Sequence, residues 1–378
     1  MILNKSPHLK LLFDARMIAH SGIGRYINNL LTQFVQMDMD PFEIILAGNP
    51  ALLQSFAGYP QIKIHPFISS VYSPQELIQW QIILKKTQPD LLHVPHYNTP
   101  VFPGSKMVAN IHDLLHWKYP ETIRNPLGRY YSKIRFKRTI QQSDVLLTLT
   151  QTIKNELGDE FSGINHKVEA IYPGIPAFIE PLDNGPMNQK ILDKYHIISP
   201  YFLFVGIDKP HKNLSRLIEA FGKVKTLLNE PVQLVITGNH DVSLFNMPEG
   251  SSIIKTGQIP DDELSILYKK ALALISPSLS EGFGFTPFEG FIHGIPSAVS
   301  DIPVYHEVCK DSVLYFNPLD TDQMASVMIR LSKEKSLRNE LITKGSQQMR
   351  EYSWNQTARK TLEVYRKLLI GGPARGFR

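Results

Sequence analysis

The chain alternates between two patterns of apolar and polar residues. Short apolar or β-branched runs are followed by longer segments with a helical period, as between Ile27 and Val35. This alternation predicts repeated βαβ units with parallel strands. In the first half of the chain the predicted strands are Lys10–Asp14, Glu43–Ala47, Leu91–Val94, Met107–Ile111, Val145–Leu149 and Val168–Ile171.

A stretch rich in proline and glycine, from Tyr172 to Pro186, interrupts the pattern and predicts a linker. The pattern then resumes, with predicted strands at Tyr201–Val205, Val232–Thr237, Leu272–Ser276, Ser297–Ser300 and Val313–Phe316. We therefore expect an α/β protein of two Rossmann-like domains, whose parallel sheets face each other across a central cleft and bind ligands at the carboxyl ends of their strands. The expected domains are an N-terminal Rossmann-like domain over residues 1–175 and a C-terminal Rossmann-like domain over 176–355. A helix over 356–370 is expected to cross back to the N-terminal domain, and 371–378 to form a flexible tail.

Length and composition agree with two folded domains. The 378 residues exceed the ~250 at which a single core stops growing, and 43% hydrophobic with 20% charged residues is typical of a globular protein. The single cysteine, Cys309, excludes an internal disulfide and favours a reducing, cytoplasmic location. No stretch approaches the ~18 uninterrupted apolar residues of a spanning helix, so membrane contact, if any, is expected to be peripheral, at the inner face.

The net charge of +5 favours anionic partners, among them nucleotide diphosphates, lipid phosphates and acidic membrane surfaces. Basic residues are spread along the chain and form no recognisable nucleic-acid module. We therefore expect no nucleic-acid partner.

The segment Ser280–Glu289, SEGFGFTPFE, is the most informative one for chemistry. Two glutamates flank a loop in which Gly282 and Gly284 leave the backbone bare, and Pro287 is placed to begin a helix. Amide groups at a helix start favour phosphate, so this loop suits a diphosphate. Two surface glutamates around a tight turn would be the alternative interpretation of their spacing alone.

A second segment, Phe204–Leu214, leads from a strand through a loop with two lysines into a helix. A fixed cation in a partly dry site stabilises the negative charge of a departing diphosphate, and Lys212 is our candidate. A solvated loop lysine is the alternative.

Two further segments follow predicted strands. His112 comes directly after Met107–Ile111, where a strand end would expose it, although buried histidines often serve only a structural hydrogen bond. The sequence Ser21–Tyr26 contains a G-x-G pattern that dinucleotide enzymes share. Those enzymes carry a carboxylate at the end of the second strand, and here that strand ends Leu46–Asn49 without one, which disfavours a nicotinamide site.

These motifs together resemble family 4 of the retaining GT-B glycosyltransferases. The resemblance rests on the E-x7-E string SEGFGFTPFE, on the Gly206–Lys212 segment and on GIGRY, which resembles a mannosyltransferase subgroup of surface polysaccharide assembly. It implies that Glu281 holds sugar hydroxyls and Glu289 both ribose hydroxyls. Ile207 stands where many members have arginine, and Lys209 is the candidate substitute.

The resemblance implies a full set of site residues. The catalytic candidates are His112, Lys212 and Glu281. The donor-binding candidates are Gly22, Gly24, Gly206, Lys209, Lys212, Gly238, Ile259, Gly282, Phe283, Gly284, Phe285, Thr286 and Glu289.

Other signals receive structural interpretations. Asp38–Asp40 and Asp320–Asp322 both spell D-x-D, but the first is expected to end a helix and the second to cap one, so neither predicts a metal site. We expect no metal and no cofactor. Six basic residues between Arg124 and Arg138 are interpreted as solvated surface, with a membrane-facing helix as the alternative.

The resemblance implies a metal-independent, retaining transfer of a hexose from a nucleotide diphosphate sugar to a glycan or lipid-linked acceptor. It favours GDP-mannose as the donor and leaves UDP-sugars as the next choice. Two other classes stay open, namely a nucleotide-sugar epimerase or hydrolase of the same fold and a non-catalytic nucleotide-sugar-binding protein.

Overall fold

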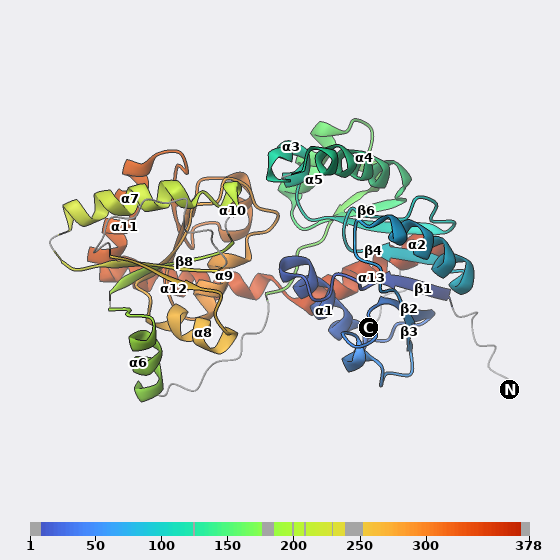
Figure 1. Cartoon of the computed structure of the whole chain (residues 1–378), viewed down its shortest axis with the longest axis horizontal. Coiled ribbons are helices and arrows are strands. Elements are labelled where there is room, and N and C mark those ends of the chain that lie inside the picture. The colour runs from blue at the N-terminus through green and yellow to red at the C-terminus, as the bar shows by residue number, and fades with distance from the viewer. Residues whose placement is uncertain are drawn as a thin grey trace. The chain divides into compact units, whose positions relative to one another are not determined.

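The computed structural model describes residues 9–123, 125–175, 185–198, 200–207, 209–228, 230–238 and 252–371. The chain divides into two compact units, Met1–Pro176 with Ser353–Arg378, and Ala177–Tyr352. Each unit contains one parallel sheet with helices on both of its sides (Figure 1). Residues 176–184 of the expected linker and 372–378 of the expected tail lie outside the described residues.

The first unit is built on a seven-stranded parallel sheet of order β3-β2-β1-β4-β5-β6-β7. Its central strands, β1, β4 and β5, are mostly buried, which is why most of their residues are apolar on both faces. The order of strands reverses between β1 and β4, which places a topological switch point there. The strands are β1 Leu9–Asp14, β2 Phe42–Gly48, β3 Ile62–Pro66, β4 Leu91–Val94, β5 Lys106–Ile111, β6 Val145–Thr148 and β7 Val168–Ala170, and the helices are α1 Ser21–Phe34, α2 Pro74–Thr87, α3 Leu115–Lys118, α4 Pro126–Gln142, α5 Gln151–Glu160 and α13 Trp354–Ile370.

The second unit has a six-stranded sheet of order β10-β9-β8-β11-β12-β13, with its switch point between β8 and β11. Successive residues of β8 point to opposite faces, so Phe202 joins the core under α7 and α11 while Tyr201 joins the core under α8. The strands are β8 Tyr201–Val205, β9 Gln233–Thr237, β10 Ile253–Gly257, β11 Ala273–Ser276, β12 Ser297–Ser300 and β13 Leu314–Phe316, and the helices are α6 Gly185–Lys194, α7 Leu214–Leu227, α8 Asp261–Lys270, α9 Phe285–Ile292, α10 Pro303–Cys309, α11 Thr321–Lys333 and α12 Lys335–Gln348.

The C-terminal helix α13 packs within the first unit. The Thr357 hydroxyl donates to the Tyr172 carbonyl at 2.8 Å, and the buried Tyr365 hydroxyl contacts Nδ1 of His93 on β4. A side chain at Gly174 would overlap the backbone nitrogen of Trp354 at 2.2 Å. Close backbone contact therefore ties the beginning of α13 to the segment that follows β7.

Two strands, β3 and β10, were not predicted from the sequence. Both lie at the edge of their sheet. Their residues are only partly buried for the most part, so the apolar signal is weak there. The weak signal explains why these two edge strands were missed, although the opposite edge strands, β7 and β13, were predicted.

Candidate functional site

In the second unit, two of the predicted segments meet at the switch point between β8 and β11. Lys212 lies in a short 3-10 helix, Pro210–Lys212, after β8, and its Nζ is 2.7 Å from Oε1 of Glu281 in the loop after β11. The Leu279 amide donates to the His211 carbonyl at 2.7 Å, which fastens the two loops together. Adjacent parallel strands thus bring two segments that are distant in the sequence to one edge of the sheet.

The Lys212–Glu281 pair is largely withdrawn from solvent. The side chains are 19% and 13% exposed respectively. Burial alone would raise the pKa of Glu281, but the charge of Lys212 and the hydrogen bond from it outweigh burial, and the pKa is lowered. Glu281 is therefore ionised and pairs with Lys212 at the carboxyl ends of the strands.

The loop after Glu281 turns into α9 through a left-handed residue. Gly284 has φ 78° and precedes Phe285, the first residue of the helix. A Cβ at this position would lie 2.4 Å from Cε1 of the buried Tyr305, so only glycine fits without movement. The amides of the first turn, including that of Thr286, have no partner within a helix of this kind and suit an anion.

Phe283 in this loop belongs to the core. Its ring stacks on Phe288 at 5.4 Å and meets Tyr352 edge-on at 5.2 Å. The side chain therefore anchors the loop, and contact with a ligand at this residue would fall to the backbone. Phe285 packs on the same ring at 4.9 Å, and its own side chain is half-buried.

Glu289 lies on α9 and is 6% exposed. The Tyr268 hydroxyl donates to its Oε2, and Nδ1 of His293 contacts its main-chain carbonyl at 2.7 Å. Tyr268 and His293 were not among the residues that sequence reasoning selected. Tyr268 lies on α8, whose sequence carries no motif, and His293 directly follows α9, so only the contacts around Glu289 reveal them.

The remaining candidates of the second unit line the same end of its sheet. The Gly206 amide donates to the Thr237 carbonyl at 3.1 Å and the Gly238 amide to the Gly257 carbonyl at 2.9 Å, so both glycines directly follow their strands. Lys209 is exposed, while Ile259 packs partly against the core. Gly282 lies between Glu281 and Phe283 in the loop already described.

His112 belongs to the first unit and directly follows β5. Its Nε2 lies 2.7 Å from the Pro95 carbonyl, and the ring of Tyr26 meets it edge-on at 5.2 Å. A carbonyl oxygen only accepts, so Nε2 carries the hydrogen and Nδ1 presents a lone pair. Burial lowers the pKa of His112, which favours this neutral form.

We expected Gly22 and Gly24 in a loop before the helix that begins near Ile27. The structure places both glycines inside that helix. Helix α1 already begins at Ser21. A Cβ on Gly24 would meet the Ile18 carbonyl oxygen at 2.3 Å, so this glycine permits a close backbone approach, whereas nothing lies within 4 Å of one on Gly22. The sequence placed the helix start too late because glycine is a poor helix former.

A buried ion cluster lies at the switch point of the first unit, and sequence reasoning did not find it. The Arg16 guanidinium donates twice to Asp14 at 2.8 Å and lies 3.1 Å from Glu76 on α2. His96 Nε2 contacts Asp14 at 3.0 Å. Asp14 is the last residue of β1 and Arg16 lies just after it, but Glu76 and His96 are distant in sequence, so no local pattern marks the cluster.

A cavity of about 360 Å³ opens beside Arg16 at the carboxyl ends of β1 to β3. The charge of Arg16 is compensated by the two carboxylates, so the cavity is polar without a strong net charge. Such a site suits a neutral ligand with hydroxyl groups. Its lining consists of Arg16, His20, Asn49, Leu52, Phe67, Ile68, Ser69, Ser70, Val71 and Tyr72.

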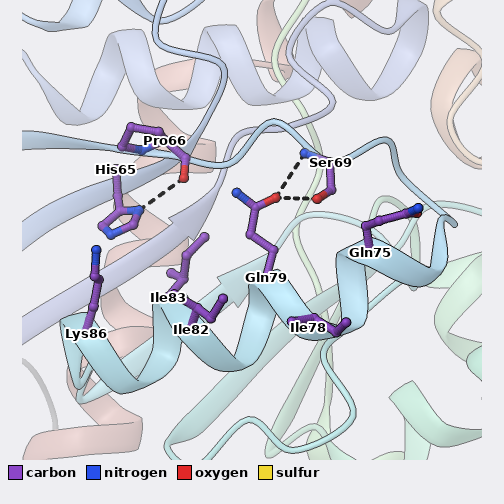
Figure 2. Close-up of a pocket in the computed structure, with 9 residues that line it drawn as sticks. All are labelled: His65, Pro66, Ser69, Gln75, Ile78, Gln79, Ile82, Ile83 and Lys86. Carbon is purple, nitrogen blue, oxygen red and sulfur yellow. Dashed lines mark hydrogen bonds between the residues drawn. The ribbon is translucent and has the colours of Figure 1, made fainter.

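A larger cavity, of about 520 Å³, lies between the end of β3 and helix α2 (Figure 2). Three isoleucines of α2 line it, Ile78, Ile82 and Ile83. Oε1 of Gln79, which also lines it, accepts a hydrogen bond from the Ser69 amide at 3.0 Å. None of the predicted site residues borders this cavity. We therefore do not assign it to the donor.

The discounted motifs differ in their outcomes. Asp320 caps α11 by accepting from the amides of Asp322 and Gln323 at 3.0 Å, as expected. The first D-x-D lies in the turn between α1 and β2 and not at the helix end, and Asp38 accepts there from the Asp40 amide at 3.0 Å. Within the described ranges, no group of three or more His, Cys, Asp or Glu side chains is placed to hold a metal ion.

The basic segment proves to be partly structural. Arg135 of α4 is buried and donates to Asn98 Oδ1 at 2.9 Å, and Arg138 donates to the Val101 carbonyl at 2.9 Å. The interpretation as solvated surface is therefore wrong for these two residues, because they tie α4 to the segment after β4. Among the described residues, no helix is both long and apolar enough to span a bilayer.

Comparison with known proteins identifies the class. Residues 20–177 match the model of Glycosyltransferase Family 4 and residues 191–348 that of Glycosyl transferases group 1. A crystal structure of a glycosyltransferase from Rickettsia africae superposes with a TM-score of 0.71 over 97% of this chain and 100% of that one, at 17% identity. This likeness concerns the fold alone and confirms the predicted GT-B fold of two Rossmann-like domains. The chain is a glycosyltransferase of the GT-B type.

It belongs to family 4 of these enzymes, as its motifs indicated. The O-antigen chain mannosyltransferase RfbU of Salmonella typhimurium is 26% identical over 275 residues, 70% of this chain and 71% of that protein. O-antigen chain mannosyltransferase B of Escherichia coli is 24% identical over 291 residues, 74% of each chain.

Proposed function

We propose that this glycosyltransferase moves a hexose, with retention at the anomeric carbon and without a metal, from a nucleotide diphosphate sugar to a hydroxyl of a glycan or lipid-linked acceptor. The observation that supports the donor site best is the Lys212–Glu281 pair, fixed at 2.7 Å beside the start of α9. The Lys212 cation and the first turn of α9 lie at the same edge of the sheet. Both can bind the negative charge of a diphosphate there.

The diphosphate would take its charge compensation from the protein. The Lys212 ammonium is partly buried, so its attraction for phosphate is less screened than on an open surface. First-turn amides after Gly284 add donors without any further charge. Glu281, held in place by Lys212, would accept hydrogen bonds from hydroxyls of the transferred sugar.

In the proposed step the bond between the anomeric carbon and the β-phosphate oxygen breaks while the acceptor oxygen bonds to the same face of that carbon. The acceptor proton passes to the departing phosphate oxygen, and the products are the glycoside and a nucleoside diphosphate. Lys212 stabilises the negative charge that grows on the leaving group. Nδ1 of His112 would accept a hydrogen bond from the sugar.

We favour GDP-mannose as the donor, with UDP-sugars next. The support comes from the two relatives named as mannosyltransferases and from GIGRY in α1. The neutral, polar cavity beside Arg16 supports an acceptor that carries sugar hydroxyls.

We also propose that α4 contacts an anionic membrane surface. Its outer face exposes Leu127 at 77%, Tyr130 at 70% and Ile134 at 44%. Lys133 and Lys137 are exposed beside them, and the helix contains no acidic residue. Apolar side chains between lysines are what an interfacial helix requires.

The central test is a thermal-shift titration of the full chain with GDP, UDP, ADP, dTDP and NAD in EDTA. A nucleotide at a hundred times its Kd adds about 2.7 kcal/mol of stability, which corresponds to a shift of roughly 5 to 10 °C. Lys212→Ala and Glu289→Ala should abolish this shift. Lys223→Ala, which removes a lysine paired with Asp322 at 2.7 Å in the same unit, should keep it.

The outcomes test the proposed donor class against a nicotinamide site. Stabilisation by one nucleoside diphosphate in EDTA supports both the donor class and metal independence. Stabilisation by NAD alone, or by none of the nucleotides, would overturn the proposal. Nuclear magnetic resonance of the product then decides the stereochemistry, and an inverted anomeric centre would refute retention.

A further inference from the structure

Glu289 is bound by a tyrosine of the preceding helix. Tyr268 on α8 is fully buried, and its hydroxyl donates to Oε2 of Glu289 on α9. A buried carboxylate is costly unless hydrogen bonds satisfy it, and an O–H donor to a carboxylate is among the stronger ones. The contact therefore fixes the orientation of the Glu289 carboxylate.

A histidine fixes the tyrosine in turn. The ring of His293 stacks on that of Tyr268, with centroids 4.7 Å apart and planes 13° from parallel. Nδ1 of His293 donates to the Glu289 carbonyl at 2.7 Å, which leaves Nε2 to accept from the Ser265 hydroxyl at 2.8 Å. The Tyr268 ring is thus held between its own helix and the end of α9.

We propose that Tyr268 is a positioning residue that sets the preference of this enzyme for ribose over 2′-deoxyribose in its donor. Its hydroxyl holds the Glu289 carboxylate in the orientation from which both oxygens accept hydrogen bonds from the two ribose hydroxyls. This inference rests on the proposed function, because it presumes that Glu289 binds the ribose of a nucleoside diphosphate.

A purely structural role for Tyr268 makes a different prediction. If the hydroxyl only joined α8 to α9, its loss would weaken binding of ribose and deoxyribose nucleotides alike. If it orients the carboxylate, its loss acts on the hydrogen bond to the 2′-hydroxyl. The ratio of the two affinities therefore distinguishes the roles, whereas either affinity alone does not.

The experiment measures binding of GDP and 2′-deoxy-GDP, and in parallel UDP and 2′-deoxy-UDP, to the full chain by calorimetry. A hydrogen bond to a carboxylate should give the wild type a preference for ribose of roughly 10- to 100-fold. We expect Tyr268→Phe to reduce this preference by about 3- to 10-fold, mainly because the ribose nucleotide binds more weakly.

Two further variants control this result. Tyr201→Phe removes another buried hydroxyl of the same unit, which donates to the Leu267 carbonyl at 2.7 Å, and should leave the ratio unchanged. Glu289→Gln should lower the ratio, and adding Tyr268→Phe to it should lower it no further, because the tyrosine acts through the glutamate.

The outcomes separate this inference from the function on which it rests. If Tyr268→Phe binds the ribose nucleotide with the wild-type preference, or weakens both nucleotides equally, Tyr268 is not a positioning residue and the proposed function stands. If the wild type binds none of the nucleoside diphosphates of the thermal-shift panel, the proposed function fails and this inference fails with it.

Discussion

Alanine at Gly284 should destabilise the second unit more than alanine at Gly294. Both glycines have left-handed backbones, with φ 78° and 70°. For alanine that conformation costs about 1 kcal/mol, and the entropy change of the unfolded chain is the same at both positions. Only at Gly284 does the added Cβ collide, 2.4 Å from Cε1 of Tyr305, while nothing lies within 4 Å at Gly294.

Tyr305 is fully buried, so the ring and the start of α9 must move to relieve the overlap. Such overpacking typically costs about 1–3 kcal/mol. We therefore expect Gly294→Ala to lose about 1 kcal/mol of unfolding free energy and Gly284→Ala about 2–4 kcal/mol. Gly284→Ala should also weaken nucleotide binding, because the displaced amides belong to the donor loop.

Urea unfolding followed by far-ultraviolet circular dichroism measures the loss, and hydrogen exchange of peptides from β11 and α9 localises it. Tryptophan fluorescence is the wrong probe here, since Trp80, Trp117 and Trp354 all belong to the other unit. Equal losses in the two variants would refute the reasoning, because the backbone conformation would then be the whole cost.

Two further predictions concern the first unit. Burial lowers the pKa of His93 from 6.5 to about 4. Between pH 6.5 and about pH 4 only the unfolded chain binds a proton at this residue. The free energy of unfolding therefore falls by about 3 kcal/mol as the pH drops through that window. His93→Gln should flatten this part of the pH profile of urea unfolding, whereas His166→Gln, at an exposed histidine, should not; an unchanged profile in His93→Gln would contradict the assignment. Changing the three exposed apolar residues of α4 to serine should abolish flotation with vesicles rich in phosphatidylglycerol. Leu319→Ser, at an exposed leucine of the second unit, should leave flotation intact, and a wild type that does not float at all would exclude the membrane contact.

The sequence by itself determined the class of fold and the loops that carry the chemistry. A strand covered on both faces is mostly apolar, so β8 is evident as the uninterrupted run YFLFV. The turn at Gly284 is encoded in the chain because a left-handed backbone in a crowded place requires glycine. Each of these properties depends on a few neighbouring residues, which is why local chemistry is enough to predict them.

The tertiary structure decided everything that depends on the order of strands. Lys212 and Glu281 are 69 residues apart and meet only because β8 and β11 are neighbours in the sheet. The contact between Tyr268 and Glu289 likewise arises from the packing of α8 on α9. The edge strand β3 was missed because its partly exposed residues give a weak apolar signal, and its pairing with β2 becomes evident only in the folded sheet. Contacts between distant segments are set by the order of the strands in the sheet, and no local sequence pattern encodes that order.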